Sequence, residues 1–127
     1  MTETVLDSSA VLASIQREPG ADVVDAALAG SAISVINFAE VVSKLISRGV
    51  PEAQAVLAAR RFGATLVDVD GDQAAMASAI HAATRPAGIS MADAFCLALA
   101  KQRGAAALTS DRAWKSLDVG VEVTLIR

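Results

Sequence analysis

GISMADAFCLALAKQRGAAALTSDRAW, residues 88–114, predicts a helix followed at once by a buried strand. Ser90 suits the position that caps a helix, and Asp93 follows three residues later, where an acidic side chain is favoured. Apolar residues then recur at helical spacing, and Gly104 is a typical helix stop. The apolar run Ala105–Leu108 is too short for a helix, so we predict a strand there.

The length of this unit brings two acidic residues to one place. A helix from Ser90 to Arg103 carries the chain about 20 Å in one direction. A five-residue strand returns it by roughly 17 Å. Asp93, in the first turn of the helix, and Asp111, just after the strand, should therefore lie at the same edge of the fold. Two acidic residues at one edge indicate a candidate site.

The rest of the chain repeats this alternation of short apolar runs and helical stretches. Ser8 or Ser9 suits the cap of the first helix, and Asp72 suits the cap of a later one. Strands that alternate with helices are typical of a parallel sheet covered on both faces. We therefore predict a single α/β domain over residues 1–127, with about five parallel strands between layers of helices. The predicted strands are residues 4–6, 32–36, 64–69, 105–108 and 121–126.

Four acidic residues fall at the carboxyl ends of the predicted strands, where open parallel sheets bind ligands. Asp7 ends the first strand, and Glu40 lies in the first turn of the helix after the second strand. Asp93 and Asp111 join them, and Asp72 is a weaker fifth candidate. Converging carboxylates repel one another unless they bind protons or cations. Oxygen ligands alone suit Mg²⁺ or Mn²⁺, and such a site can hydrolyse phosphodiesters.

Each of these residues also has a purely structural explanation. Asp7 and Asp111 suit helix caps, and Asp93 suits the positive end of a helix. Glu40 suits an ion pair with Lys44, one helical turn away. The functional interpretation therefore depends on the convergence of all four.

Further polar residues lie close to the predicted site. Thr109 and Ser110 offer hydroxyl groups beside Asp111, where they can support a metal ligand. Arg112 and Lys115 follow the strand, and Arg85 lies in the loop before the main helix. These three cations can contact substrate phosphates, or they can simply be solvated.

Composition restricts the partners and the location of the protein. The net charge is −3, so only a local basic patch or a metal ion would bind a polyanion. The single cysteine, Cys96, excludes an intrachain disulfide and suits a reducing compartment. The first residues lack the basic and apolar pattern of a signal peptide, and no apolar run approaches a membrane span. We expect a soluble cytoplasmic protein without a membrane partner.

Four segments together resemble the PIN domain family. They are VLDSSA (5–10), NFAEVVSKL (37–45), GISMADAFCLALA (88–100) and ALTSDRAW (107–114), and the resemblance spans essentially the whole chain. It is closest to the VapC-type ribonuclease toxins of toxin–antitoxin pairs. The resemblance implies a three-layer PIN-like fold and a Mg²⁺-dependent endoribonuclease. It implies that Asp7, Glu40, Asp93 and Asp111 are the catalytic and metal-binding acids.

The resemblance also implies partners. A cognate VapB-type antitoxin is expected to bind the early helices and occlude the site, and the toxin commonly forms a homodimer or a toxin–antitoxin hetero-oligomer. Core burial is the default role of the apolar residues in these helices, but an antitoxin would need some of them exposed. They are Val11, Leu12, Ile15, Val23, Val24 and Leu28.

One departure and three alternatives stay open. Ala113 stands where many relatives carry a further polar or acidic residue just after the last aspartate. This departure argues against a second metal ion, but not against the first. A PIN nuclease of RNA processing or DNA repair would carry the same acids, and a non-catalytic PIN module would share only the fold. Phosphoryl transfer through an aspartyl intermediate on Asp7 is disfavoured, because Ser9 replaces the usual second aspartate.

Overall fold

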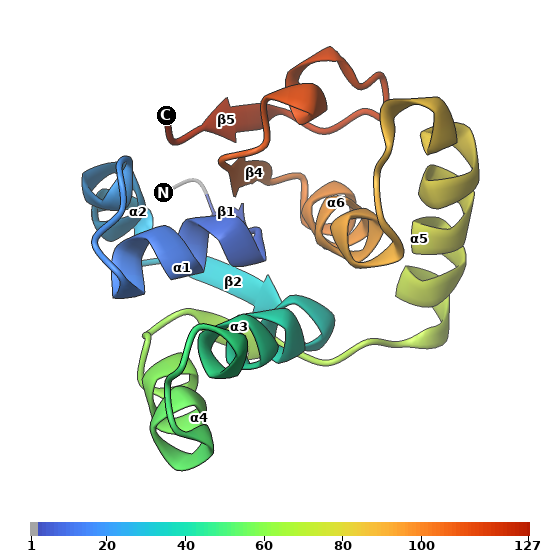
Figure 1. The fold of residues 1–127 in the computed structure, drawn as a ribbon. Coiled ribbons are helices and arrows are strands. Elements are labelled where there is room, and N and C mark those ends of the chain that lie inside the picture. Colours follow the sequence, from blue (N-terminus) through green and yellow to red (C-terminus); the bar gives the residue numbers. More distant parts are fainter. Residues whose placement is uncertain (1–2) are drawn as a thin grey trace.

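The computed structural model describes residues 3–127, which form five parallel strands and six α-helices (Figure 1). The strand order is β3-β2-β1-β4-β5, and every neighbouring pair is parallel. The predicted α/β class with a five-stranded parallel sheet is confirmed. The strands are β1 (Thr4–Leu6), β2 (Ser31–Ser34), β3 (Thr65–Val67), β4 (Ala106–Thr109) and β5 (Val123–Leu125).

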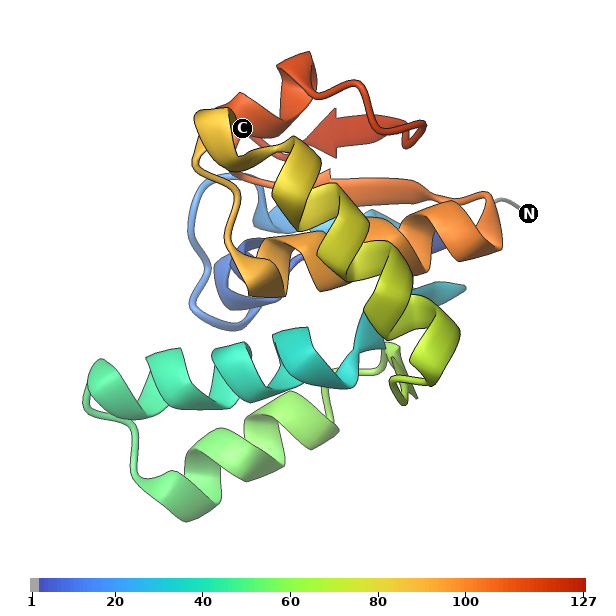
Figure 2. The same ribbon diagram turned by 90° about the vertical axis from the view of Figure 1, so that its right-hand side faces the viewer.

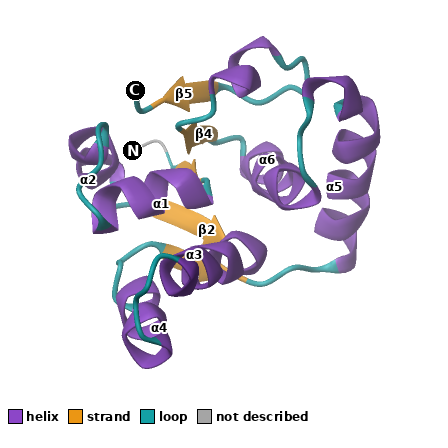
Figure 3. Cartoon of the chain, in the orientation of Figure 1, coloured by secondary structure: helices purple, strands orange, loops and turns teal. Residues whose placement is uncertain are grey.

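Helices connect the strands and cover both faces of the sheet (Figure 3). Two short 3₁₀ turns, η1 (Arg85–Ala87) and η2 (Arg112–Ser116), precede α6 and β5. The α-helices are α1 (Ser8–Ile15), α2 (Ala21–Ala27), α3 (Val35–Ser47), α4 (Glu52–Arg60), α5 (Gly71–Ala83) and α6 (Met91–Arg103).

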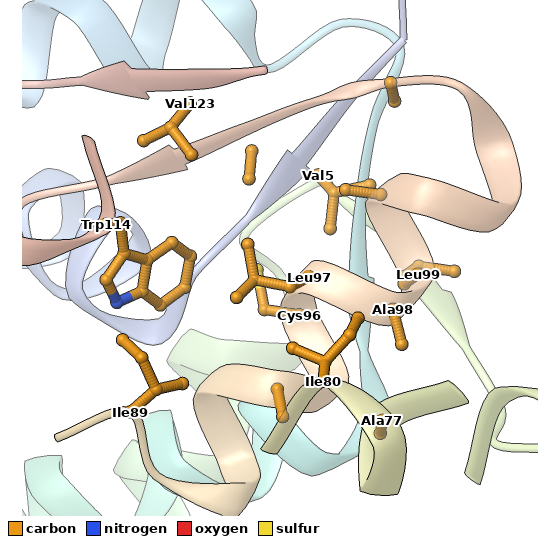
Figure 4. Packing of buried hydrophobic residues seen from close by; sticks show 14 residues of the cluster. Val5, Ala77, Ile80, Ile89, Cys96, Leu97, Ala98, Leu99, Trp114 and Val123 are labelled. Atoms are coloured by element: carbon orange, nitrogen blue, oxygen red, sulfur yellow. The ribbon is translucent and has the colours of Figure 1, made fainter. Parts of the chain in front are cut away.

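Two separate apolar cores lie on the two faces of the sheet. Val5 and Ala107 point into the core formed with α5 and α6, whereas Leu6 and Leu108 point into the core formed with the earlier helices. This alternation follows from the two-residue period of a strand. Figure 2 shows α5 and α6 together on one face, and Figure 4 shows Trp114 packed in the same core. The central strands are therefore covered on both faces, as is typical of a parallel sheet, whereas the edge strand β3 keeps Thr65 and Leu66 exposed.

The α6–β4 unit forms as predicted. Ser90 Oγ accepts a hydrogen bond from Asp93 N at 3.0 Å, and Asp93 Oδ2 accepts one from Ser90 N at 3.0 Å. This reciprocal capping box fixes the start of α6. Gly104 ends the helix with φ +60°, a conformation that favours glycine.

Two predicted helix caps are wrong. Asp7 occupies the cap position of α1, and Ser8 and Ser9 lie inside the helix, because Asp7 is the only residue between the end of β1 and the start of α1. Asp70 caps α5 by accepting a hydrogen bond from Gln73 N at 2.7 Å, and Asp72 lies in the first turn instead. Polar neighbours compete for a cap, and the end of the preceding segment decides between them.

The second strand is shorter than predicted. It ends at Ser34 rather than at residue 36, because the Ser34 side chain accepts a hydrogen bond from Ile36 N at 3.2 Å and starts α3. The β-branched residues Val35 and Ile36 consequently form the first helical turn. In the part of the chain that the structure describes, no helix is long and apolar enough to span a membrane.

Candidate metal centre

The sheet brings the ends of β1 and β4 together at its middle. Asp7 follows β1 directly, and Asp111 lies two residues after β4. These strands are adjacent, and Asp7 N donates a hydrogen bond to Leu108 O at 2.9 Å. The chain order reverses between β1 and β4, which is where ligands bind in open parallel sheets. The structure therefore places Asp7 and Asp111 at the edge that the sequence predicted.

Asp7 is buried, and its two carboxylate oxygens differ. Oδ2 accepts a hydrogen bond from Ser9 Oγ at 2.7 Å and one from Thr109 Oγ1 at 2.8 Å. Oδ1 is buried with no hydrogen-bond partner among the residues described. Burying an unpaired acceptor is unfavourable unless something else satisfies it. Asp7 Oδ1 thus needs a partner that residues 3–127 do not supply.

The backbone after β4 holds both hydroxyl groups in place. Ser110 N donates a hydrogen bond to Ser9 Oγ at 3.0 Å, and Asp111 N donates one to Thr109 Oγ1 at 3.1 Å. Thr109 is fully buried and supports Asp7 through its hydroxyl. Ser110 supports the same network through its amide, and its own hydroxyl makes no hydrogen bond within residues 3–127.

Glu40 approaches from α3 and contacts an unpredicted neighbour. Its Oε1 accepts a hydrogen bond from Asn37 Nδ2 at 3.2 Å. Asn37 Nδ2 also donates to Ala92 O at 3.0 Å, directly before Asp93 on α6. The expected alternative for Glu40, an ion pair with Lys44, does not form within the described chain.

The structural explanations hold for two of the four acids. Asp93 completes the capping box of α6, and Asp111 Oδ1 accepts a hydrogen bond from Ala113 N at 3.0 Å to cap η2. Asp7, by contrast, makes no side-chain capping bond to α1. Neither helix capping nor ion pairing therefore accounts for Asp7 or Glu40.

The acids act on one another electrostatically. Burial raises the pKa of Asp7 to about 6, even though the Ser9 and Thr109 hydroxyls lower it, and the charges of Asp93 and Glu40 raise it further. Burial also raises the pKa of Asp93 against the lowering effect of its Ser90 hydrogen bonds. The charges of Glu40 and Asp111 add to that rise. All four carboxylates thus share one negative field.

The donor set fits a hard cation, but the side chains are not arranged around one. Among residues 3–127, no three acidic, histidine or cysteine side chains stand close enough to hold a metal ion together. Asp93 and Asp111 each use one carboxylate oxygen for a local cap. Each therefore keeps a second oxygen outside its cap, and Asp7 Oδ1 is the buried carboxylate oxygen that lacks a partner within residues 3–127. Carboxylate oxygens suit Mg²⁺ or Mn²⁺.

The remaining predicted residues differ in availability. Lys115 Nζ donates a hydrogen bond to Val123 O at 2.8 Å, which ties its charge to the backbone. Arg85 and Arg112 are exposed, and neither side chain forms a hydrogen bond within the described residues. Asp72 lies at the start of α5, where Gln73 Nε2 donates to Gln102 Oε1 near the end of α6. Asp72 therefore lies away from Asp93, which begins α6.

Two residues of the site, Ser9 and Asn37, were not predicted as site residues from the sequence. Asn37 is fully buried, although it is polar and lies on the apolar face of a helix. An asparagine one turn before Glu40 is the available signal, because residues three apart on a helix are neighbours. Ser9 carried no comparable signal, since its bond to the backbone of Ser110 spans 101 residues.

An apolar cavity of about 170 Å³ lies between α1, β2, α3, α4 and the segment after α4, and none of the four acids lines it. The guanidinium of Arg60 lies 5.8 Å from the centre of the Phe38 ring at this cavity. Of the early apolar residues, Val11, Leu12 and Val24 are buried in the core, whereas Val23 is 41% exposed. The cavity is lined by Val11, Ile33, Phe38, Val41, Ala59, Arg60, Phe62, Ala64 and Leu66.

Comparison with known families and solved structures gave matches over most of the chain. Residues 4–120 match the family model described as PIN domain. The structure resembles DNA-bound VapBC from Salmonella typhimurium, with a TM-score of 0.79, 17% identity and complete coverage of both chains. No curated protein sequence matches.

Two further solved structures share the fold. A toxin–antitoxin complex from Klebsiella pneumoniae has a TM-score of 0.73 at 17% identity and 98% coverage of each chain. A member of the VapBC family of toxin–antitoxin systems from Mycobacterium tuberculosis has a TM-score of 0.66 at 22% identity. The alignment covers 100% of this chain and 99% of that one.

Proposed function

The chain belongs to the PIN domain family, and on that premise we propose that it is a Mg²⁺-dependent endoribonuclease that acts as the toxin of a toxin–antitoxin pair. Asp7, Glu40, Asp93 and Asp111 are the proposed metal-binding and catalytic acids, and Mn²⁺ is an alternative ion. The family supports a nuclease, and the four acids support its dependence on a divalent cation.

The observation that carries this proposal is the state of Asp7. Two hydroxyl groups hold Oδ2, so the carboxylate has a fixed orientation, while Oδ1 is buried without a partner. Buried carboxylate oxygens usually have a hydrogen-bond partner, so an unpaired Oδ1 beside three further acids favours a bound cation. A cation at Oδ1 would satisfy this oxygen and neutralise the field of the neighbouring carboxylates.

The residues divide the work of hydrolysis. A bound divalent cation supplies Lewis-acid polarisation of the phosphodiester and a lower pKa for the attacking water. Asp7 supplies the anchored oxygen, and Asp93 and Asp111 supply oxygens from the first turn of α6 and the end of β4. Glu40, which is half-buried on α3, is placed to bind the ion or to accept a proton from the water.

The substrate is proposed to be RNA held mainly by its phosphates. Arg112 directly follows Asp111, and Arg85 lies in the connection into α6, so both cations flank the site in sequence. Both are exposed, and neither is engaged within residues 3–127. Cations of this kind bind phosphate without reading the base sequence. Cleavage after a defined sequence would require further contacts.

The decisive experiment measures cleavage of total cellular RNA by the purified protein with Mg²⁺ and with EDTA. Asp93→Asn should abolish cleavage while preserving the fold, because asparagine retains an oxygen that can accept the Ser90 hydrogen bond. Asp72→Asn is the matched control, an exposed acid in the first turn of another helix. Discrete RNA fragments that still form in the presence of EDTA, or with the Asp93→Asn variant, would refute the proposal.

We place the antitoxin in the apolar cavity lined by Phe38 and Phe62, which Val11 of α1 also lines, rather than on the buried residues of α2. The cavity can take one apolar side chain of a partner, and Arg60 at its edge favours an acidic neighbour on that partner. The test first looks for a small reading frame beside the gene and co-expresses its product with the chain. The product should co-purify with the chain and suppress RNA cleavage.

Matched variants test the placement of the antitoxin. Ala59→Arg should block the cavity and weaken co-purification, because Ala59 lines it. Ala82→Arg, on the exposed face of α5, should leave co-purification unchanged. Equal co-purification of both variants would place the antitoxin elsewhere.

A further inference from the structure

Asn37 connects two of the elements that form the site. It lies in the first turn of α3 and is fully buried. Its side-chain nitrogen donates one hydrogen bond to Glu40 Oε1 at 3.2 Å and another to Ala92 O at 3.0 Å. Ala92 directly precedes Asp93, so a single amide links the Glu40 carboxylate to the backbone that carries Asp93.

The orientation of this amide is fixed by its neighbours. Both contacts of the nitrogen are acceptors, a carboxylate oxygen and a carbonyl oxygen, so the opposite orientation would place three acceptors together. The amide oxygen, Asn37 Oδ1, is buried and has no partner among the residues described. An arrangement that leaves one polar atom unsatisfied is poor for stability, which points to a role in the site.

We propose that Asn37 is a positioning residue: its amide holds the Glu40 carboxylate and the first turn of α6 at a fixed separation, so that Glu40 and Asp93 are presented together to a divalent cation. The inference rests on the proposed metal site and adds a residue to it. Asn37 does not bind the ion in this role. It acts through Glu40, because the amide removes the rotational freedom that this long side chain would otherwise have.

The test compares Asn37→Leu with the wild-type protein in metal binding and in stability. Leucine has a similar size and shape, and it removes both hydrogen bonds together with the unsatisfied oxygen. We expect the dissociation constant for Mn²⁺, measured by calorimetry, to rise about 10-fold. The unfolding midpoint in EDTA should stay the same or rise. A purely structural asparagine predicts the opposite, a lower midpoint with unchanged Mn²⁺ binding.

Two controls separate positioning from a general effect of burial. Gln73→Leu removes another buried amide with an unpartnered oxygen, but it lies near the far end of α6 and should leave Mn²⁺ binding unchanged. In a Glu40→Ala background, which lacks the acceptor of the Asn37 hydrogen bond, Asn37→Leu should change the dissociation constant less than 2-fold, because Asn37 then has no side chain at position 40 to orient. Additive losses would overturn the proposal.

The outcomes distinguish this inference from the proposed function. A wild-type protein that binds no Mn²⁺ overturns the metal site, and the role of Asn37 with it. If the wild-type protein and Asn37→Leu bind Mn²⁺ equally tightly, only the role of Asn37 is overturned. Asn37→Ala provides a second variant of the same kind, with a smaller side chain, and should show the same loss of Mn²⁺ affinity.

Discussion

Thr109 donates its hydroxyl hydrogen bond to Asp7 Oδ2 at 2.8 Å, across 102 residues of sequence. The contact joins the end of β4 to the end of β1, and it leaves Asp7 Oδ1 as the oxygen without a partner. The orientation of the buried carboxylate is therefore determined by a residue from the opposite end of the chain.

We predict that Thr109→Val reduces Mg²⁺-dependent RNA cleavage about 10-fold or more, the usual cost of removing a group that supports a metal ligand. Valine keeps the shape of threonine but cannot donate to Asp7. Thr109→Ser should restore most of the activity, because it restores the hydroxyl group. Cleavage assays at matched Mg²⁺ concentration check both variants, and equal losses in Val and Ser would contradict the role of the hydroxyl.

Asp7 should make the metal-free protein less stable as pH rises. Its pKa is raised to about 6 in the folded state from a value of 3.8, so the folded state binds the proton more tightly than the unfolded state does. The stabilising contribution is fully present below the unfolded pKa and is lost as pH rises through about 6. Asp7→Asn removes this dependence because asparagine stays neutral.

The measurement is chemical unfolding in EDTA at several pH values. Relative to the wild-type protein, Asp7→Asn should gain about 2 kcal/mol in the free energy of unfolding between about pH 4.5 and pH 7. A constant difference across this range would show that Asp7 has an ordinary pKa.

The cap of α5 gives a direct test of a corrected prediction. Asp70→Ala should cost about 1 kcal/mol, because Asp70 Oδ1 accepts a hydrogen bond from Gln73 N. Asp72→Ala should cost a few tenths of a kcal/mol at most, since Asp72 contributes only through its position near the positive end of the helix. Thermal unfolding of the two variants checks the ranking, and the reverse order would reinstate Asp72 as the cap.

Gly20 and Gly49 form a matched pair with the same φ of +96°. Alanine at either position is strained by roughly 1–2 kcal/mol. At Gly20 the added Cβ would also lie 2.6 Å from Ile126 O, whereas at Gly49 nothing lies within 4 Å. Gly20→Ala should therefore lower the unfolding midpoint clearly more than Gly49→Ala does. Similar unfolding midpoints for the two variants would mean that the backbone around Ile126 moves away from the added Cβ at little cost.

Local chemistry explains which features the sequence could predict. The capping box of Ser90 and Asp93 depends on residues three apart, and it forms as predicted. The lengths of a helix and a strand predicted that Asp93 and Asp111 lie at one edge, and the position of Asp7 at the end of a parallel strand predicted that it joins them. These predictions needed no knowledge of contacts between residues that are distant in the sequence.

Contacts between distant segments explain what the sequence could not predict. The pairing of Asn37 with Ala92 O spans 55 residues, and no local pattern indicates it. The caps of α1 and α5 were misassigned because neighbouring polar residues are equally good caps until the preceding segment fixes where the helix begins. Which carboxylate oxygen Asp93 and Asp111 each use for a local cap depends on side-chain rotation, which the sequence likewise does not indicate.

The long separation between Asp7 and Thr109 has a consequence for synthesis of the chain. A ribosome adds about 5–20 residues per second, so Asp7 waits at least roughly 5 s before Thr109 is made. Throughout that interval β1 lacks its neighbour β4, and the carboxylate lacks the hydroxyl that orients it. The buried carboxylate of the proposed site therefore gains the hydroxyl that orients it only late in synthesis, once residue 109 has been added.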